Sequence, residues 1–88
     1  ESPQPEGMHI QVYPNPTKGR FIVELDSEEK TNYHIQIFNE SGRKIREMKK
    51  LNVSYLKKNF DLTGVDPGIY LIKFNIGDHW LTKKVLIK

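Results

Sequence analysis

The 88-residue sequence contains no cysteine, so neither disulfide bonds nor thiolate metal sites can reinforce the fold. It has no apolar run long enough to span a membrane as a helix. No stretch keeps a helical period of apolar residues; residues 43–56 fit one only in their first half and are predicted as strand, loop and strand. Hydrophobic packing and backbone pairing therefore have to stabilise one small domain, which leaves little room for a buried active site.

Charge of neither sign dominates the chain. Fourteen Lys and Arg against eleven Asp and Glu give a net charge of +3, which favours anionic surfaces weakly and does not indicate a nucleic-acid-binding protein. The basic residues between positions 43 and 58 are predicted to form a solvated strand face rather than a nucleic-acid groove. They are Arg43, Lys44, Arg46, Lys49, Lys50, Lys57 and Lys58.

No constellation of residues indicates catalysis, a cofactor or a metal. His9, His34 and His79 do not share a metal-ligand spacing within one strand or helix. The serines lack a nucleophile elbow and a partner base. The aspartates lie near turns, where short acceptors usually bond to backbone amides. The sequence therefore predicts a protein that is not an enzyme.

Apolar residues recur at every second position in several segments, as in Phe21, Val23 and Leu25, which predicts strands with one buried face. Turn residues separate these segments, and Gly77 and Asp78 suit a two-residue hairpin turn. Residues 1–7 are rich in Pro, Gly and acidic groups and are predicted to be a linker before a folded unit at 8–88. The expected strands are 9–13, 19–26, 32–39, 43–49, 54–61, 69–76 and 79–87, an all-β sandwich of about seven antiparallel strands.

The segment VYPNPTKG, residues 12–19, is the most distinctive part of the chain. Pro14 cannot donate a hydrogen bond to a strand ladder, so a strand ending at Tyr13 must stop there or lie at an edge. Gly19 can supply a positive φ before the next strand begins. On these grounds alone the segment is a rigid turn. Trp80, beside the predicted hairpin, is expected to be a core anchor more readily than an exposed ligand platform.

Four blocks, YPNPTKGRF, IFNESGRKI, LTGVDPGIYLIKF and TKKVLIK, follow one another in this order. Together they resemble the type IX secretion system (Por secretion system) C-terminal sorting domain, type A, over residues 10–88. The resemblance implies an immunoglobulin-like β-sandwich at the C-terminus of proteins exported across the outer membrane of Bacteroidetes-type bacteria. The family's motif residues fall on Tyr13, Pro14, Asn15, Pro16, Gly19, Phe21, Gly42, Leu62, Gly68, Tyr70, Lys83, Lys84, Val85 and Lys88.

The same resemblance implies a non-catalytic signal without a cofactor. Such a domain presents an upstream cargo, joined here through residues 1–7, to the outer-membrane translocon and its shuttle. A surface sortase then usually removes the domain and attaches the cargo to anionic lipopolysaccharide, so that the cargo ends at the cell surface or in the medium. Nucleic acid is not an expected partner.

The last strand allows two interpretations. Lys83, Lys84 and Lys88 can protect a sheet edge from aggregation, or they can be recognised by the secretion machinery, and the resemblance favours recognition. An exposed edge can also pair with a partner strand, including one from a second copy. An alternative function remains open at this point: a carbohydrate- or protein-binding (adhesion) module of a secreted enzyme, which would use Trp80 and the tyrosines.

Overall fold

The computed structural model describes residues 7–88, which form five antiparallel strands. The strands are β1 (Met8–Tyr13), β2 (Arg20–Phe38), β3 (Lys44–Asp61), β4 (Gly68–Ile76) and β5 (His79–Ile87). The sheet runs in the order β1, β2, β4, β5, and β3 also pairs with β2. In this part of the chain no helix is long and apolar enough to cross a membrane.

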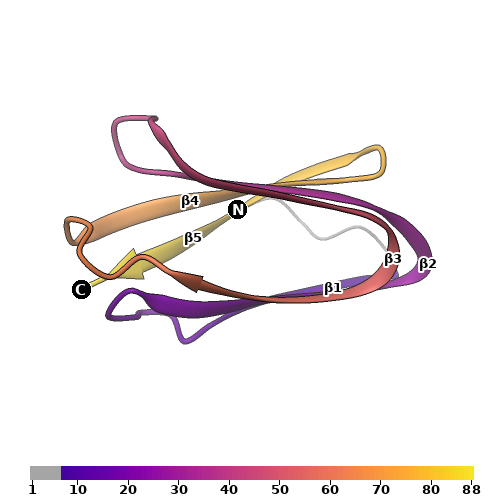
Figure 1. The fold of residues 1–88 in the computed structure, drawn as a ribbon, viewed down its shortest axis with the longest axis horizontal. Helices are drawn as coiled ribbons and strands as arrows, with labels where there is room; N and C mark the ends of the chain where they lie inside the picture. Colours follow the sequence, from indigo (N-terminus) through magenta and orange to yellow (C-terminus); the bar gives the residue numbers. More distant parts are fainter. Residues whose placement is uncertain (1–6) are drawn as a thin grey trace.

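The long strands β2 and β3 bend back together, so that the sheet curls into two layers (Figure 1). The first part of β2 pairs with β1 and with the end of β3, whereas its last part pairs with β4 and with the start of β3. The register of the β2–β3 pair shifts around Thr31, at the bend. Such irregularities increase local twist and allow a strand to turn from one layer into the next.

The core fills the space inside the curled sheet. Residues of alternate positions point inward, as the burial of Phe21, Val23 and Leu25 along β2 shows. All strands contribute to one cluster of seventeen buried apolar residues, in which Phe74 and Ile72 of the central strand β4 are fully buried. The prediction that period-two segments form strands around a single core is confirmed.

The expected number of about seven strands is wrong, because the structure has five. The predicted strands 19–26 and 32–39 are parts of the continuous strand β2, and 43–49 and 54–61 are parts of β3. Residues 43–56 therefore contain no intervening loop. The β2–β3 pairing resumes beyond the bend after register shifts, which composition alone does not show.

The turn between β4 and β5 is the two-residue hairpin predicted at Gly77 and Asp78, since Ile76 pairs with His79 and Gly77 has a φ of 57°. The expectation that Trp80 is a core anchor is wrong: its side chain is 65% exposed. Trp80 lies one position from the buried Leu81, and neighbouring strand residues point to opposite faces of the sheet.

Candidate functional site: the motif end and the edge of the last strand

All four sequence blocks meet at one end of the molecule, which we call the motif end. Here β1, β3 and β5 end and β2 and β4 begin (Figure 1). The other end holds the bend of β2 and β3 and the β4–β5 turn. The antiparallel topology thus brings together segments that are up to about 70 positions apart in the chain.

Residues 15–17, which we call the strap, lie along the outer edge of β5. The Asn15 side chain donates through Nδ2 to the Lys84 carbonyl at 2.9 Å and accepts through Oδ1 from the Leu86 amide at 3.0 Å. The Thr17 amide donates to the Leu86 carbonyl, and the Lys88 amide donates to the Thr17 carbonyl, both at 2.9 Å. These four hydrogen bonds satisfy the Lys84 carbonyl, both backbone groups of Leu86 and the Lys88 amide.

Thr17 is held firmly on the domain side of the strap. It is a buried polar residue, and its hydroxyl donates to the Arg20 carbonyl at 2.5 Å and accepts from the Gly19 amide at 3.1 Å. A parallel bridge joins it to Ile87. The flanking peptide bonds Tyr13–Pro14 and Asn15–Pro16 are both cis. The segment 12–19 is therefore a turn, as predicted, and also a cover for the last strand.

Gly19 connects the first block to the third. Its φ is 132°, which confirms the positive φ expected for it, and its carbonyl accepts the Leu62 amide at 2.8 Å. A Cβ at Gly19 would lie 3.1 Å from the Thr63 Cα and amide nitrogen. The backbone at residues 62–63 therefore packs too closely against position 19 for an ordinary side chain.

The second and third blocks are joined by Glu40, whose Oε1 accepts the Ile69 amide at 3.1 Å. Gly68 then pairs with Ile87 of β5, and Ile87 bridges Thr17 on its other side. Gly42, with a φ of 87°, closes the β2–β3 turn. Contacts thus run without interruption from the β2–β3 turn across β4 and β5 to the strap.

Several predicted motif residues lie in the core rather than at the surface. Phe21 stacks on Phe60 with ring centroids 5.7 Å apart. Leu62 and Val85 are fully buried, and the buried Tyr70 donates its hydroxyl to the Asp66 carbonyl at 2.5 Å. Burial also raises the pKa of Tyr70. These positions stabilise the fold, and their side chains are not available to a partner.

Tyr13 lies on the outer face and shares one carboxylate with a second tyrosine. Tyr55 and Tyr13 donate to the two oxygens of Glu24, at 2.6 and 2.7 Å. The two hydrogen bonds, that from Tyr55 first, lower the pKa of Glu24, and those to Glu24 raise the pKa of both tyrosines. The group connects β1, β2 and β3 through side chains that already have partners.

The three motif lysines differ in exposure. Lys84 and Lys88 are exposed, whereas Lys83 is half-buried on the same face of β5 as Val85. Within residues 7–88 none of the three forms an ion pair. This end of β5 therefore presents uncompensated positive charge beside the strap.

We predict that Asn15→Ala opens the strap locally. The change removes two hydrogen bonds, each of which contributes about 0.5–1.5 kcal/mol. The Leu86 amide should consequently exchange about tenfold faster in hydrogen-exchange NMR. Asn15→Asp, which keeps the acceptor for Leu86 but loses the donor to Lys84, should have an intermediate effect. Unchanged exchange at Leu86, with the central Ile72 amide as the reference, would show that Asn15 does not hold the strap.

The basic residues of β3 line an exposed strand, as predicted, with one strong local interaction. Glu47 accepts from Lys44 Nζ at 2.8 Å and contacts His34 Nε2 on the neighbouring β2. These hydrogen bonds, that from Lys44 first, lower the pKa of Glu47 to about 2. His34 is thereby placed in a cross-strand contact with Glu47.

This depressed pKa predicts an acid-dependent contribution to stability. Because the folded-state pKa lies below the ordinary value of 4.5, the contribution of ionised Glu47 is complete above pH 4.5 and is lost as the pH falls toward about 2. In urea denaturation, Glu47→Gln should lower the midpoint above pH 4.5 and leave it nearly unchanged at pH 2. A midpoint difference that is constant over this range would contradict the assignment.

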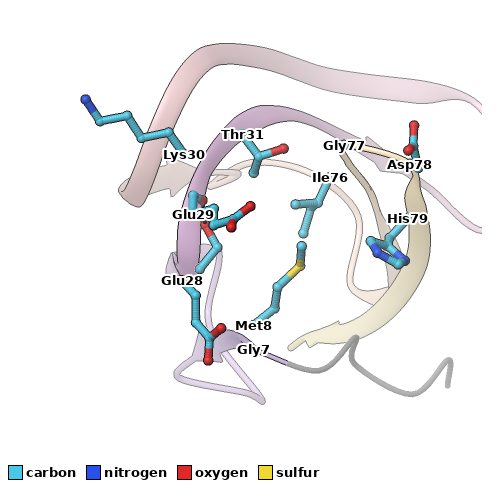
Figure 2. A pocket seen from close by; sticks show the side chains of 11 residues that line it. Gly7, Met8, Glu28, Glu29, Lys30, Thr31, Ile76, Gly77, Asp78 and His79 are labelled. Atoms are coloured by element: carbon cyan, nitrogen blue, oxygen red, sulfur yellow. Dashed lines mark hydrogen bonds between the residues drawn. The ribbon is translucent and has the colours of Figure 1, made fainter.

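A hollow opens at the end of the molecule opposite the motif end (Figure 2). Met8 and Ile76 reach toward each other across it, and Lys30 points away. Charged residues from the bend of β2, among them Glu28, line the remainder. Within residues 7–88 no group of three or more His, Cys, Asp or Glu side chains could hold a metal ion. The hollow contains no arrangement of groups that indicates chemistry.

The structure adds three residues that the sequence did not single out: Thr17, Glu40 and Leu86. Thr17 and Leu86 bond to each other through their backbones, which every residue type possesses, so their side chains do not signal this contact. Glu40 stands in a turn sequence, where its bond to Ile69 across 29 positions is not visible. Of the predicted motif residues, Asn15, Lys84 and Lys88 meet directly at the strap.

A model of the secretion system C-terminal sorting domain family matches residues 11–88. A comparison with curated proteins finds no match. The family suggests a non-catalytic role and gives no support to the alternative of a carbohydrate- or protein-binding module. The match spans all four blocks that meet at the motif end. The chain belongs to the family of type IX secretion C-terminal sorting domains.

Proposed function

We propose that this domain is a non-catalytic signal that directs an attached cargo through the type IX secretion system across the outer membrane. Membership of the sorting-domain family supports export out of the cell. We also propose that the translocon and its shuttle recognise the end of β5. The observation that carries this proposal is the set of hydrogen bonds that joins the first block to the stretch from Lys84 to Lys88, at the end of the molecule where all four blocks meet.

The motif residues differ in whether they have structural partners, and this difference supports recognition at β5. The glycines, prolines and buried side chains hold the motif end together, and so they have structural tasks. Lys84 and Lys88, in contrast, are exposed and lack ion pairs within the described residues. Exposed charges without a structural partner are suited to an encounter with another protein.

We further propose that the curled sheet is a variant of the immunoglobulin-like sandwich. The support is that β2 and β3 each contribute to both layers, so the two layers contain three and four strand segments around one core.

Sortase cleavage and attachment of the cargo to anionic lipopolysaccharide complete the proposal. We propose that cleavage occurs near residues 1–7, which precede the matched region 11–88. Mass spectrometry of the secreted product checks the position: a new terminus within this stretch agrees with the proposal, and a secreted product that keeps residues 8–88 contradicts cleavage.

Export of a reporter tests the function. Residues 1–88 are fused to a fluorescent protein that carries an export signal and are expressed in a bacterium with type IX secretion. We expect the reporter at the surface or in the medium, and in the periplasm of a matched strain without the translocon. Periplasmic retention in the competent strain, with secretion of a native substrate intact, would contradict the proposed function.

A further inference from the structure

The outer edge of β5 is only partly covered. On one side β5 pairs with β4 over its whole length, and on the other side the strap bonds to Lys84, Leu86 and Lys88. In an antiparallel strand the backbone groups of successive residues point alternately to the two sides. Since Lys84 and Leu86 direct theirs to the strap, Trp80 and Thr82 direct theirs to the same side.

No residue of the described part of the chain, 7–88, bonds to the outward backbone groups of Trp80 and Thr82. Among the residues that the structure describes, the outer edge therefore has an open half, residues 80–82, and a covered half from Lys84 onward. The two halves are continuous along one strand. A paired strand that starts at Trp80 would reach the strap after four residues.

Another exposed edge of the protein differs from this one in its side chains. Within residues 7–88, β3 pairs only with β2, and its other edge carries lysines and arginines that discourage strand pairing. The open half of β5 carries no Lys, Arg, Asp or Glu and contains the exposed Trp80. An edge without protective charge is suited to accept a strand.

A strand from a partner could take over the hydrogen bonds that the strap now makes to β5. An incoming strand could supply a donor for the Lys84 and Leu86 carbonyls and an acceptor for the Leu86 and Lys88 amides, which are the four groups that Asn15 and Thr17 now satisfy. No backbone group of β5 would be left without a partner in the exchange.

We propose that the outer edge of β5 is a docking edge for an extended, acidic strand of a partner protein, which pairs first with residues 80–82 and then displaces the strap. This inference rests on the proposed function, because the partner is then a component of the export machinery. The acidic character follows from Lys83, Lys84 and Lys88, whose positive charges are uncompensated within residues 7–88.

Proline at position 82 tests the docking edge in the reporter fusion. The Thr82 amide faces outward, so Thr82→Pro removes a donor from the docking edge and leaves the bonds to β4. Export should fall about tenfold, the change expected when one strand hydrogen bond is lost. Thr82→Val keeps the amide and should be exported like the parent. Circular dichroism of the isolated domains establishes that both variants fold.

A charge variant provides a second test, which does not depend on whether the proline variant folds. Lys84 is exposed, so Lys84→Glu should leave the fold intact and reduce export several-fold, whereas Lys84→Arg should not. Suppose that the parental fusion is exported. Normal export of a folded Thr82→Pro variant, or normal export of Lys84→Glu, would then contradict the docking edge but not the sorting function. Failure of the parental fusion itself would instead contradict the sorting function.

Discussion

Phe74→Ala should lower the free energy of unfolding by about 3–5 kcal/mol, the range for removing a fully buried aromatic side chain. Phe74 is 0% exposed at the centre of β4, where it faces Ile35 of β2 and Leu81 of β5 across the ladders. Small domains are stable by only about 5–15 kcal/mol, so this loss is a large fraction of the total stability. Urea denaturation monitored by circular dichroism measures the effect.

Leu51→Ala is the matched control for this change. Leu51 is 67% exposed on β3, so its truncation should alter stability by no more than about 0.5 kcal/mol. Similar losses for Phe74→Ala and Leu51→Ala would contradict the placement of the core inside the curled sheet.

Gly19→Ala should strongly destabilise the motif end. The φ of 132° alone costs about 1–3 kcal/mol for a residue with a Cβ. The new Cβ would also lie 3.1 Å from the Thr63 backbone, and overpacking of this kind adds about 1–3 kcal/mol. Because Gly19 connects the strap to residues 62–63, we expect lower stability together with faster amide exchange at Leu62.

Gly42→Ala separates the two contributions. Gly42 also has a positive φ, 87°, but a Cβ there would meet no atom within 4 Å. Gly42→Ala should therefore lose only the stability that the positive φ costs a residue with a Cβ. Its free energy of unfolding should exceed that of Gly19→Ala by about 1–3 kcal/mol. Equal destabilisation by the two substitutions would show that close packing at residues 19 and 63 is unimportant.

The local features of the fold could be predicted from the sequence. Period-two alternation located the strand segments, and turn residues located the Gly77–Asp78 hairpin, because both depend on neighbouring residues alone. The continuity of β2 through residues 27–32 could not be predicted, since polar residues there resemble a loop. The stretch is held by partners distant in the chain: Ser27 pairs with Met8 of β1, and Thr31 pairs with Val53 of β3. The alternation of side chains along the strand could have placed Trp80 correctly, because Trp80 lies on the face opposite Leu81 and Val85.

Some members of the candidate site could be predicted from the sequence, but the contacts between them could not. The resemblance to the family selected Asn15, Gly19 and Lys84. It did not show that the Asn15 side chain bonds to β5 across 69 and 71 positions of the chain. Such contacts depend on the curl of the whole sheet, which no single segment encodes. The structure thus changes the first block from a turn into a cover for the last strand.

Site-specific photocrosslinking tests most directly the central claim that the export machinery contacts the outer edge of β5. A photoreactive amino acid is placed at position 82 or, as a control, at the exposed position 51 of β3 in the reporter fusion. The account predicts crosslinks to an outer-membrane component of the secretion system from position 82 and not from position 51. Export of both fusions with no crosslink from position 82, or with equal crosslinks from both positions, would contradict it.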